Sequence, residues 1–362
     1  MKLSFNMELV CRWCSSLAAL GGVALMGFGA PVQGEFIFEQ APFAQCHAST
    51  IAEAGDGDLV AAWFGGTREK HPDVGIWISR NESGRWSEPR EIANGVQYVL
   101  TDGTVRRHPT WNPVLFQVPG GPLILFYKVG PTPETWWGVR LESADGGRTW
   151  GTPQRLPEEV LGPIKNKPVL LSDGTLLCPS SREVPGAGWT VHLELSRDLG
   201  RTWQLTPALK SEDGLNAIQP SVLIHTDGRL QILCRSKEGV VATAWSRDAG
   251  LTWSGLQATK LPNPNSGTDA VTMADGRHLL VYNPTRPDEG KWGGPRTPLI
   301  VAVSTDGVSW RTLATLENEP GEYSYPAIIQ GADGRVHVTY TWRRTRIRHV
   351  TLDVAALRSG GS

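Results

Sequence analysis

Cationic side chains recur at one kind of position in this chain of 362 residues, just after a short apolar run that follows a tight-turn signal. They are Arg68, Lys128, Arg182, Arg235, Arg286 and the pair Arg343 and Arg344. Arginine binds a carboxylate through two parallel hydrogen bonds, so these side chains would suit a small anionic ligand, above all a carboxylate. Any one of them could equally be an ordinary rim residue, so the prediction depends on whether the fold brings them together.

The elements that must position these side chains are marked by a Trp-ended motif that occurs five times. Three copies fit Ser-x-Asp-x-Gly-x-Thr-Trp in full, the first is degenerate and the last is one residue short; the copies span 79–86, 143–150, 196–203, 246–253 and 304–310. In each motif the Asp can accept hydrogen bonds from the N–H groups just after it, and the Gly supplies a turn with positive φ. A repeat at roughly 50 to 65 residues indicates a unit that buries its faces against its neighbours.

A second repeat alternates with the first and sets the number of these units. It is a tight turn followed by an apolar strand, in six copies: 55–63, 119–127, 172–178, 226–234, 274–282 and 332–340. Asp-Gly between apolar runs is a strong hairpin signal. We therefore predict an all-β fold over residues 35–355, a six-bladed β-propeller with four-stranded antiparallel blades. Residues 35–39 are expected to supply the outer strand of the last blade, and 356–362 a disordered tail.

In such a propeller the first strand of every blade lines the central tunnel. The residues just before it then reach the same face, here called the mouth, as the cations that follow the second strand. This reasoning adds further candidates to the mouth: His47, His108, Trp111, Asn112, Lys165, Asn166, Gln219, Asp269, Tyr323 and Tyr325. Trp111 could form a stacking platform for a sugar together with Trp136 and Trp137, although Trp136 could equally pack between blades.

The motifs and the six-blade count resemble the sialidase (neuraminidase) superfamily, whose propellers carry these Asp boxes. The resemblance covers nearly all of residues 36–350. It implies an arginine triad that binds a sialic acid carboxylate, an Asp as acid/base, and a Tyr nucleophile activated by a Glu.

Several positions match the sialidase pattern. Arg68, at the end of Trp-Phe-Gly-Gly-Thr-Arg, and Arg235 and Arg296 match carboxylate-binding arginines. Asp73 falls where the acid/base belongs, and Tyr323, in Glu-Tyr-Ser-Tyr, matches the context of the nucleophile. His108, Trp111, Asn112, Lys165, Asn166, Asp269 and Tyr325 are expected to contact the substrate.

Two positions depart from the sialidase pattern. The first triad arginine is replaced by His47, and the Glu that activates the nucleophile by Gln219. Glutamine cannot take a proton from a tyrosine, whereas histidine titrates near neutral pH. Three functions therefore stay open: hydrolysis next to a terminal acidic sugar, β-elimination on a uronate glycan with His47 as base and Tyr323 or Asp73 as acid, and glycan binding without catalysis.

Composition and the N-terminal sequence limit the expected partners and location of the protein. The 35 Lys and Arg balance 36 Asp and Glu, which does not favour nucleic acid as a partner. Residues 1–34 are typical of a secretory signal, with a retained anchor as the alternative, so we expect a secreted or periplasmic protein without a membrane span once the signal is removed. We expect a monomer with a glycan substrate, without cofactor or metal, in which Cys46, Cys178 and Cys234 are buried thiols.

Overall fold

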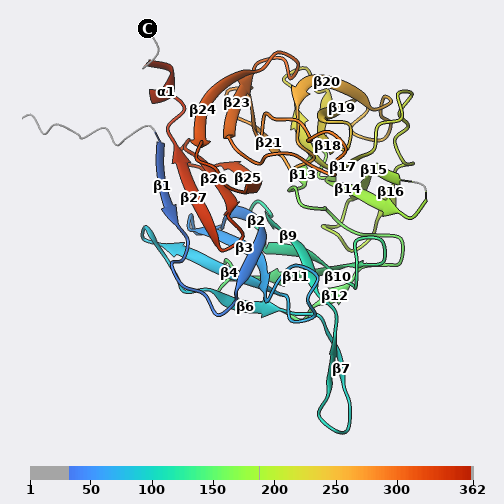
Figure 1. The fold of residues 1–362 in the computed structure, drawn as a ribbon, viewed down its shortest axis with the longest axis vertical. Helices are drawn as coiled ribbons and strands as arrows, with labels where there is room; N and C mark the ends of the chain where they lie inside the picture. Colours follow the sequence, from blue (N-terminus) through green and yellow to red (C-terminus); the bar gives the residue numbers. More distant parts are fainter. Residues whose placement is uncertain (1–31, 187, 360–362) are drawn as a thin grey trace, which may run out of the picture. The chain divides into compact units, whose positions relative to one another are not determined.

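The computed structural model describes residues 32–186 and 188–359, which form six antiparallel sheets of four or more strands arranged as the blades of a propeller (Figure 1). From its inner to its outer strand, the first blade consists of β2 (Gln45–Glu53), β3 (Leu59–Gly66) and β4 (Gly75–Glu82), with β5 (Arg85–Trp86) and β6 (Arg90–Ala93) both paired with β4; the second consists of β9 (Thr110–Gln117), β10 (Leu123–Val129), β11 (Trp137–Ser143) and β12 (Gln154–Arg155). The third blade consists of β13 (Val169–Leu170), β14 (Leu176–Val184), β15 (Gly188–Ser196) and β16 (Gln204–Leu205), and the fourth of β17 (Ala217–Ile224), β18 (Leu230–Ser236), β19 (Val240–Ser246) and β20 (Gln257–Pro262). The fifth blade consists of β21 (Asp269–Thr272), β22 (His278–Tyr282), β23 (Leu299–Ser304) and β24 (Arg311–Glu317), and the last of β25 (Tyr323–Gln330), β26 (Val336–Trp342), β27 (Arg346–Leu352) and β1 (Val32–Phe36). The prediction of a six-bladed all-β propeller is confirmed.

The N-terminal strand closes the ring, as predicted. β1 pairs antiparallel with β27, from Val32 opposite Leu352 to Phe36 opposite Arg348. The strand lies a little earlier than expected, so the predicted boundary at residue 34 falls inside β1. The Glu35 carboxylate ties the strand to its neighbours because it accepts a hydrogen bond from Trp86 Nε1 at 2.9 Å and lies 3.0 Å from His349 Nδ1.

The Asp boxes form the turns between the third and fourth strands, by the mechanism read from the sequence. In the copy at 196–203, Asp198 Oδ1 accepts hydrogen bonds from the backbone N–H of Thr202 at 2.7 Å and of Arg201 at 3.0 Å. Gly200 has φ +91°, and Trp203 Nε1 donates to its carbonyl oxygen at 3.1 Å. The Trp203 ring lies 6.2 Å from that of Phe126 in the preceding blade, so the motif joins neighbouring blades.

The Asp boxes are expected to make the fold acid-sensitive. Hydrogen bonds from the Thr202 N–H and hydroxyl lower the pKa of Asp198 to about 2, and those from Ser309 and Val308 lower that of Asp306 to about 2. A carboxylate with a lowered pKa stabilises the fold above its unfolded value near 3.8, and that contribution is lost as the pH falls toward 2. The urea midpoint should therefore fall between pH 4 and pH 2, and fall less steeply in Asp198→Asn. Equal slopes in the two proteins would contradict this account.

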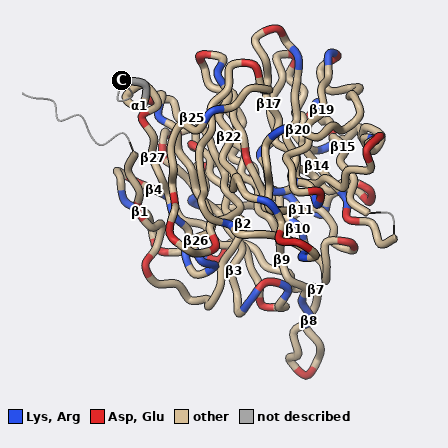
Figure 2. The backbone as a smooth tube through the Cα atoms, turned by 45° about the horizontal axis from the view of Figure 1, so that its top comes forward, with Lys and Arg blue, Asp and Glu red and all other residues tan. Residues whose placement is uncertain are grey.

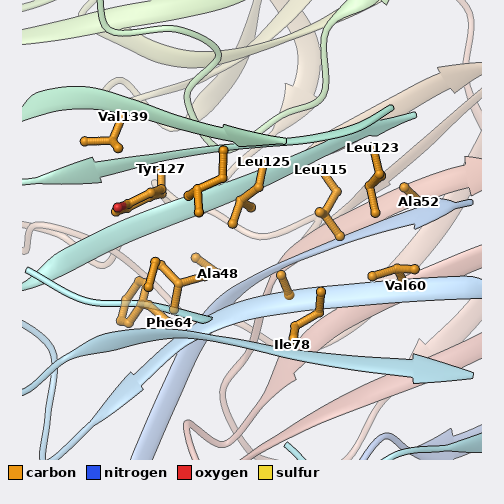
Figure 3. Close-up of a cluster of buried hydrophobic side chains, with 14 of the residues drawn as sticks. Ala48, Ala52, Val60, Phe64, Ile78, Leu115, Leu123, Leu125, Tyr127 and Val139 are labelled. Atoms are coloured by element: carbon orange, nitrogen blue, oxygen red, sulfur yellow. The ribbon is translucent and has the colours of Figure 1, made fainter. Parts of the chain in front are cut away.

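The hydrophobic core lies between the blades, where their faces meet. Figure 3 shows one such cluster, in which Val60 and Ile78 of the first blade pack with Leu115, Leu123 and Leu125 of the second. The middle strands are buried on both faces and therefore read as continuous apolar runs. The three described cysteines are buried free thiols, as predicted.

Two features at the edges of the fold differ from the prediction. A hairpin of β7 (Val96–Val99) and β8 (Val105–Arg107), which the sequence analysis missed, projects between the first two blades and exposes Tyr98 and Val99 (Figure 1). The segment expected to be a disordered tail begins with one helical turn, α1 (Ala356–Ser359).

No helix in the described residues is both long and apolar enough to cross a membrane, and basic and acidic residues are interspersed along the backbone (Figure 2).

Candidate active site

The mouth of the tunnel is built by a backbone irregularity that four blades share. β2, β9, β17 and β25 each shift register by one residue near the start of the strand. At each shift one residue has positive φ: Ala48, Asn112, Gln219 and Tyr325, between +39° and +58°. Residues with side chains pay of order 1–3 kcal/mol for this conformation, and such strain clusters at functional sites. Proline follows three of the four, where its missing N–H suits a break in the ladder.

Tyr325 lies at the centre of this mouth. Its hydroxyl accepts a hydrogen bond from an Arg235 guanidinium nitrogen at 2.7 Å, and Gln219 Nε2 lies 3.4 Å from the same oxygen. The His47 ring packs against the tyrosine ring, with 4.1 Å between centroids. Three blades thus converge on one half-buried phenol whose oxygen faces a fixed positive charge.

Three arginines gather around this tyrosine. Arg296 and Arg344 are both oriented by Glu322, whose Oε1 accepts hydrogen bonds from them at 2.8 and 2.9 Å. Arg235 is oriented separately, because its Nε donates to Asn265 Oδ1 at 2.7 Å. Each guanidinium has further N–H groups besides those in these hydrogen bonds, so the three arginines can bind a carboxylate through several charge-assisted hydrogen bonds.

The third arginine of this cluster is Arg344, where the sequence predicted Arg68. Arg68 is exposed and lines a small cleft together with His47, Glu69 and Arg344. Arg344 also pairs with Glu69 Oε2 at 2.5 Å, which fixes its position between the first and last blades. Arg235 and Arg296 lie in the cluster as expected.

His47 is held neutral at the heart of the cluster. Burial lowers its pKa well below the ordinary value, and the charges of Arg344, Arg296 and Arg235 lower it further, as does that of Lys165. Its Nδ1 lies 2.9 Å from the Thr341 hydroxyl, while Nε2 is buried and has no hydrogen-bond partner among the described residues. A neutral imidazole with an unpartnered nitrogen can accept a proton or bind a substrate hydroxyl.

The neutrality of His47 can be tested by a pH titration. Because its folded pKa lies below the unfolded value near 6.5, its neutral form stabilises the fold above that pH, and this contribution is lost as the pH falls below it. The ring C–H resonance of His47, assigned by comparison with His47→Gln, should stay constant in NMR spectra from pH 8 to pH 5. A shift with a midpoint near 6.5 would show that the imidazole is exposed to solvent instead.

Asp73, the predicted acid/base, is held in the loop after β3. Its carboxylate accepts hydrogen bonds from Thr67 Oγ1 at 2.6 Å and Thr67 N at 3.0 Å, and His71 Nδ1 lies 2.7 Å away. Burial alone would raise the pKa of Asp73, but these contacts outweigh it and lower the pKa. A general acid must carry a proton, so Asp73 would have to exchange these contacts for substrate before it could act as one.

The structure buries Tyr323, the predicted nucleophile, and the catalytic role of this residue stays a prediction. Its side chain is only 1% exposed and packs in the core of the last blade, beside Trp342. Its hydroxyl accepts a hydrogen bond from Arg343, which lies outside the arginine cluster. The register shift at Tyr325 is the reason, because it turns the second tyrosine of Glu-Tyr-Ser-Tyr, and not the first, to the mouth.

Several residues expected to contact substrate instead tie the blades together. Lys165 is buried and its Nζ donates to the carbonyls of Thr268, at 2.7 Å, and Pro326, while burial lowers its pKa to about 7. Asp269 accepts hydrogen bonds from Ser221, Ile328 and Lys167, and Asn166 donates to the Gln219 carbonyl. Trp111 is buried with Nε1 bonded to the Gly130 carbonyl. All four groups are thus already used in contacts within the protein, and their contact with substrate stays a prediction.

Asn112 and His108 stay closer to the prediction. Asn112 is the strained residue of its blade at the mouth, although it is buried. His108 is half-buried, with its ring 5.8 Å from that of Trp137. Contact of either with substrate stays a prediction.

The sequence analysis missed Arg344 and Glu322 as members of the site. Arg344 stood among the cations that follow second strands, but the alternating charges of 343–348 suggested a solvated face. Glu322 begins the Glu-Tyr-Ser-Tyr run that was placed at the mouth, but no role in the site was assigned to it. Only the ring closure, which brings the last blade beside the first, shows that both belong with His47.

A ring of six blades, five of which carry an Asp-box motif, with a mouth that gathers arginines around a tyrosine defines a propeller of the sialidase-like class. The chain belongs to the family with a BNR repeat-like domain, whose model matches residues 57–338.

Individual relatives agree with this class. A sialidase of Bacteroides fragilis is 23% identical over 241 residues, which cover 61% of this chain and 41% of that protein, so the chain spans less than half of this curated relative. Among solved structures, a protein of unknown function from Dyadobacter fermentans has a TM-score of 0.72 at 18% identity, covering 89% of this chain and 99% of that one. The Trypanosoma rangeli sialidase has a TM-score of 0.70 at 13% identity, covering 91% and 61%. The structural likenesses show the fold.

Proposed function

We propose that the protein is a carbohydrate-active enzyme that cuts a glycan at a terminal acidic sugar, sialic acid or a uronate. The observation that carries this proposal is the Tyr325 hydroxyl, 2.7 Å from Arg235 and within a cluster completed by Arg296 and Arg344. The arginine cluster suits the carboxylate of an acidic sugar, and the Tyr325 hydroxyl suits a reaction at the carbon atom next to that carboxylate. Relatives named as sialidases support the same substrate class.

In the hydrolytic reaction the three arginines would hold the carboxylate while Tyr325 attacks the anomeric carbon. The phenol oxygen forms the new bond and loses its proton to solvent, the glycosidic C–O bond breaks, and Asp73 gives its proton to the leaving oxygen. Water, deprotonated by Asp73, then displaces the tyrosine oxygen, which regains a proton from solvent, and the sugar is freed. Arg235 would stabilise the phenolate form of Tyr325, which has Gln219 where sialidases carry a basic Glu.

A second reaction is favoured by the neutral state of His47. On a uronate whose carboxylate is held by arginines, the proton on the carbon next to the carboxylate is acidified. In a uronate that carries another sugar on O4, His47 Nε2 would take this proton, the bond between C4 and that glycosidic oxygen would break, and Tyr325 or Asp73 would protonate the oxygen. The product is an unsaturated uronate, and no water is consumed.

One experiment separates these reactions. The protein is incubated with sialyl oligosaccharides, with uronate-terminated oligosaccharides and with oligosaccharides that contain a uronate substituted at O4, and products are followed by mass spectrometry and ultraviolet absorbance. Free acidic sugar indicates hydrolysis, whereas an absorbing unsaturated uronate, lighter by one water than the hydrolytic product, indicates elimination. Binding without any product would reduce the proposal to glycan recognition, and neither binding nor product would refute it.

We further propose that the chain is exported. The support is the signal-like composition of residues 1–34, which lie almost entirely outside the described residues. N-terminal sequencing of the extracellular or periplasmic protein tests this, and recovery of the full chain from the cytoplasm would contradict it.

A further inference from the structure

The hairpin of β7 and β8 carries most of the exposed apolar side chains of the described chain, and we propose that it is an arm through which two copies of the protein form a dimer. Nine large hydrophobic side chains are exposed in the described residues, and five of them lie on this hairpin. They are Val96, Tyr98, Val99, Leu100 and Val105. Single exposed apolar side chains are common, but a contiguous group of them marks a contact surface.

The proposed dimer differs from the monomer expected from the sequence, where the hairpin was not recognised. Its interface is a surface of the scaffold and does not depend on which glycan the candidate active site accepts.

The hairpin has a fixed root and a free body. At the root, the His108 N–H donates to the Gly95 carbonyl at 2.9 Å, and Arg107 Nη2 donates to the Asp73 carbonyl at 2.8 Å. Beyond the root, β7 and β8 pair only with each other in the described residues and stand clear of the blades (Figures 1 and 2). A hairpin of two strands is at most marginally stable in water by itself, so a partner that pairs with it would stabilise it.

Both faces of the hairpin present apolar groups to solvent. Tyr98 lies opposite Arg106, and Val99 lies opposite Val105. Opposed residues point to the same face of a sheet and successive residues to opposite faces, so the tyrosine and the valine pair lie on different sides. Tyr98 is 58% and Val99 60% exposed. A partner strand along the edge of the hairpin would place its own side chains beside both groups, whereas a flat surface would cover only one face.

The free edge of β7 suits pairing with the same strand of a second copy. Its four residues run Val-Gln-Tyr-Val and carry no charge, whereas β8 ends in Arg106 and Arg107. Sheet edges that stay unpaired are commonly protected by charged side chains, which β7 lacks. When a strand pairs antiparallel with its own copy, a two-fold axis relates the two chains, which is the commonest symmetry of protein dimers.

The charges of the hairpin favour this antiparallel arrangement. Asp102 lies at the tip, where its Oδ1 accepts a hydrogen bond from the Thr104 N–H at 2.9 Å, while Arg106 and Arg107 lie toward the root. When two hairpins lie side by side in opposite directions, the acidic tip of each lies beside the basic root of the other. The same tip carboxylate disfavours a lipid membrane as the partner, because insertion of the hairpin would take this charge into the hydrocarbon first.

Sedimentation velocity tests the dimer, with the purified protein at about 1 to 100 µM. A micromolar dissociation constant is expected, because residues 96–107 are fewer than the roughly 20–30 residues a side of a standard interface. Tyr98→Lys and Val99→Lys should each raise it at least about tenfold, since a lysine would charge the paired edge. Both side chains are exposed, so the urea midpoint should not change. Val308→Lys, at an Asp-box turn and 69% exposed, is the matched control and should leave the dimer intact.

Two further sets of variants locate the interface. Asp102→Arg and Arg106→Asp should each weaken the dimer, and the double variant should restore it, because the reversed charges attract again. Gln97→Cys, near the middle of β7, should form a disulfide between two copies when oxidised with copper phenanthroline. The unsubstituted protein, whose described cysteines are buried, and Val308→Cys should not.

The results that would overturn the arm are equally definite. A protein that stays monomeric up to about 100 µM has no such dimer. A dimer that Tyr98→Lys and Val99→Lys leave unchanged uses another surface. Association of the monomer with vesicles of anionic phospholipid, lost in Tyr98→Lys, would identify a membrane as the partner and exclude the second copy.

Discussion

Replacement of Tyr325 by phenylalanine is expected to lower kcat for the cleaved glycan by about 10²–10⁴-fold, the range typical of a lost proton-transfer or nucleophilic group. The hydroxyl is the only atom removed, and it is the atom that Arg235 and Gln219 contact. The ring, which packs on His47, stays in place, so the fold and the affinity for the acidic sugar should change little. Steady-state kinetics on the substrate identified by product analysis measures the effect.

Tyr323→Phe is the matched control for this experiment. Its hydroxyl contacts Arg343 in the blade, and its loss should cost about 0.5–1.5 kcal/mol of stability while kcat stays within a few-fold of the original value. The opposite ranking, with Tyr323→Phe inactive and Tyr325→Phe active, would return the catalytic role to the position that the sequence pattern suggested. Equal activity of all three proteins would exclude both tyrosines from the reaction.

The propeller could be predicted from the sequence because its signals are local. Each Asp box combines an Asp, a Gly and a Trp within eight residues, and the hydrogen bonds of Asp198 reach only the next few N–H groups. The Asp-Gly hairpins likewise depend on adjacent residues. Both kinds of turn lie at the edge opposite the mouth, so the repeats that identify the fold are remote from the residues that bind the ligand.

The site was harder to predict because it depends on contacts across the ring. A one-residue register shift decides whether Tyr323 or Tyr325 faces the mouth, because it changes which side chains of the strand point to that side. The amino-acid composition of the strand does not reveal such a shift. Lys165 and Asp269 were predicted at the mouth, but Lys165 donates to the Thr268 carbonyl and Asp269 accepts from the Ile328 N–H, backbone groups of blades more than 50 residues away. His47 and Gln219 were identified from their departure from the sialidase pattern, and both do lie against Tyr325.

Arg344 gives the second large effect that we expect. Arg344→Met should lower kcat/KM for the acidic glycan by about 10²–10³-fold, as much as Arg296→Met does, because each variant removes one charge-assisted partner of the carboxylate and leaves Glu322 with the other arginine and Ser324. Part of the loss should appear as weaker binding of the free acidic sugar, which calorimetry measures directly. Arg68→Met is the control from the same cleft: Arg68 is exposed and lies outside the group that Glu322 orients, so its loss should cost less than about tenfold. If Arg68→Met instead matches Arg296→Met while Arg344→Met is nearly unaffected, the carboxylate is held by the arginines of the sequence pattern, and Arg344 serves only to join the last blade to Glu69 of the first.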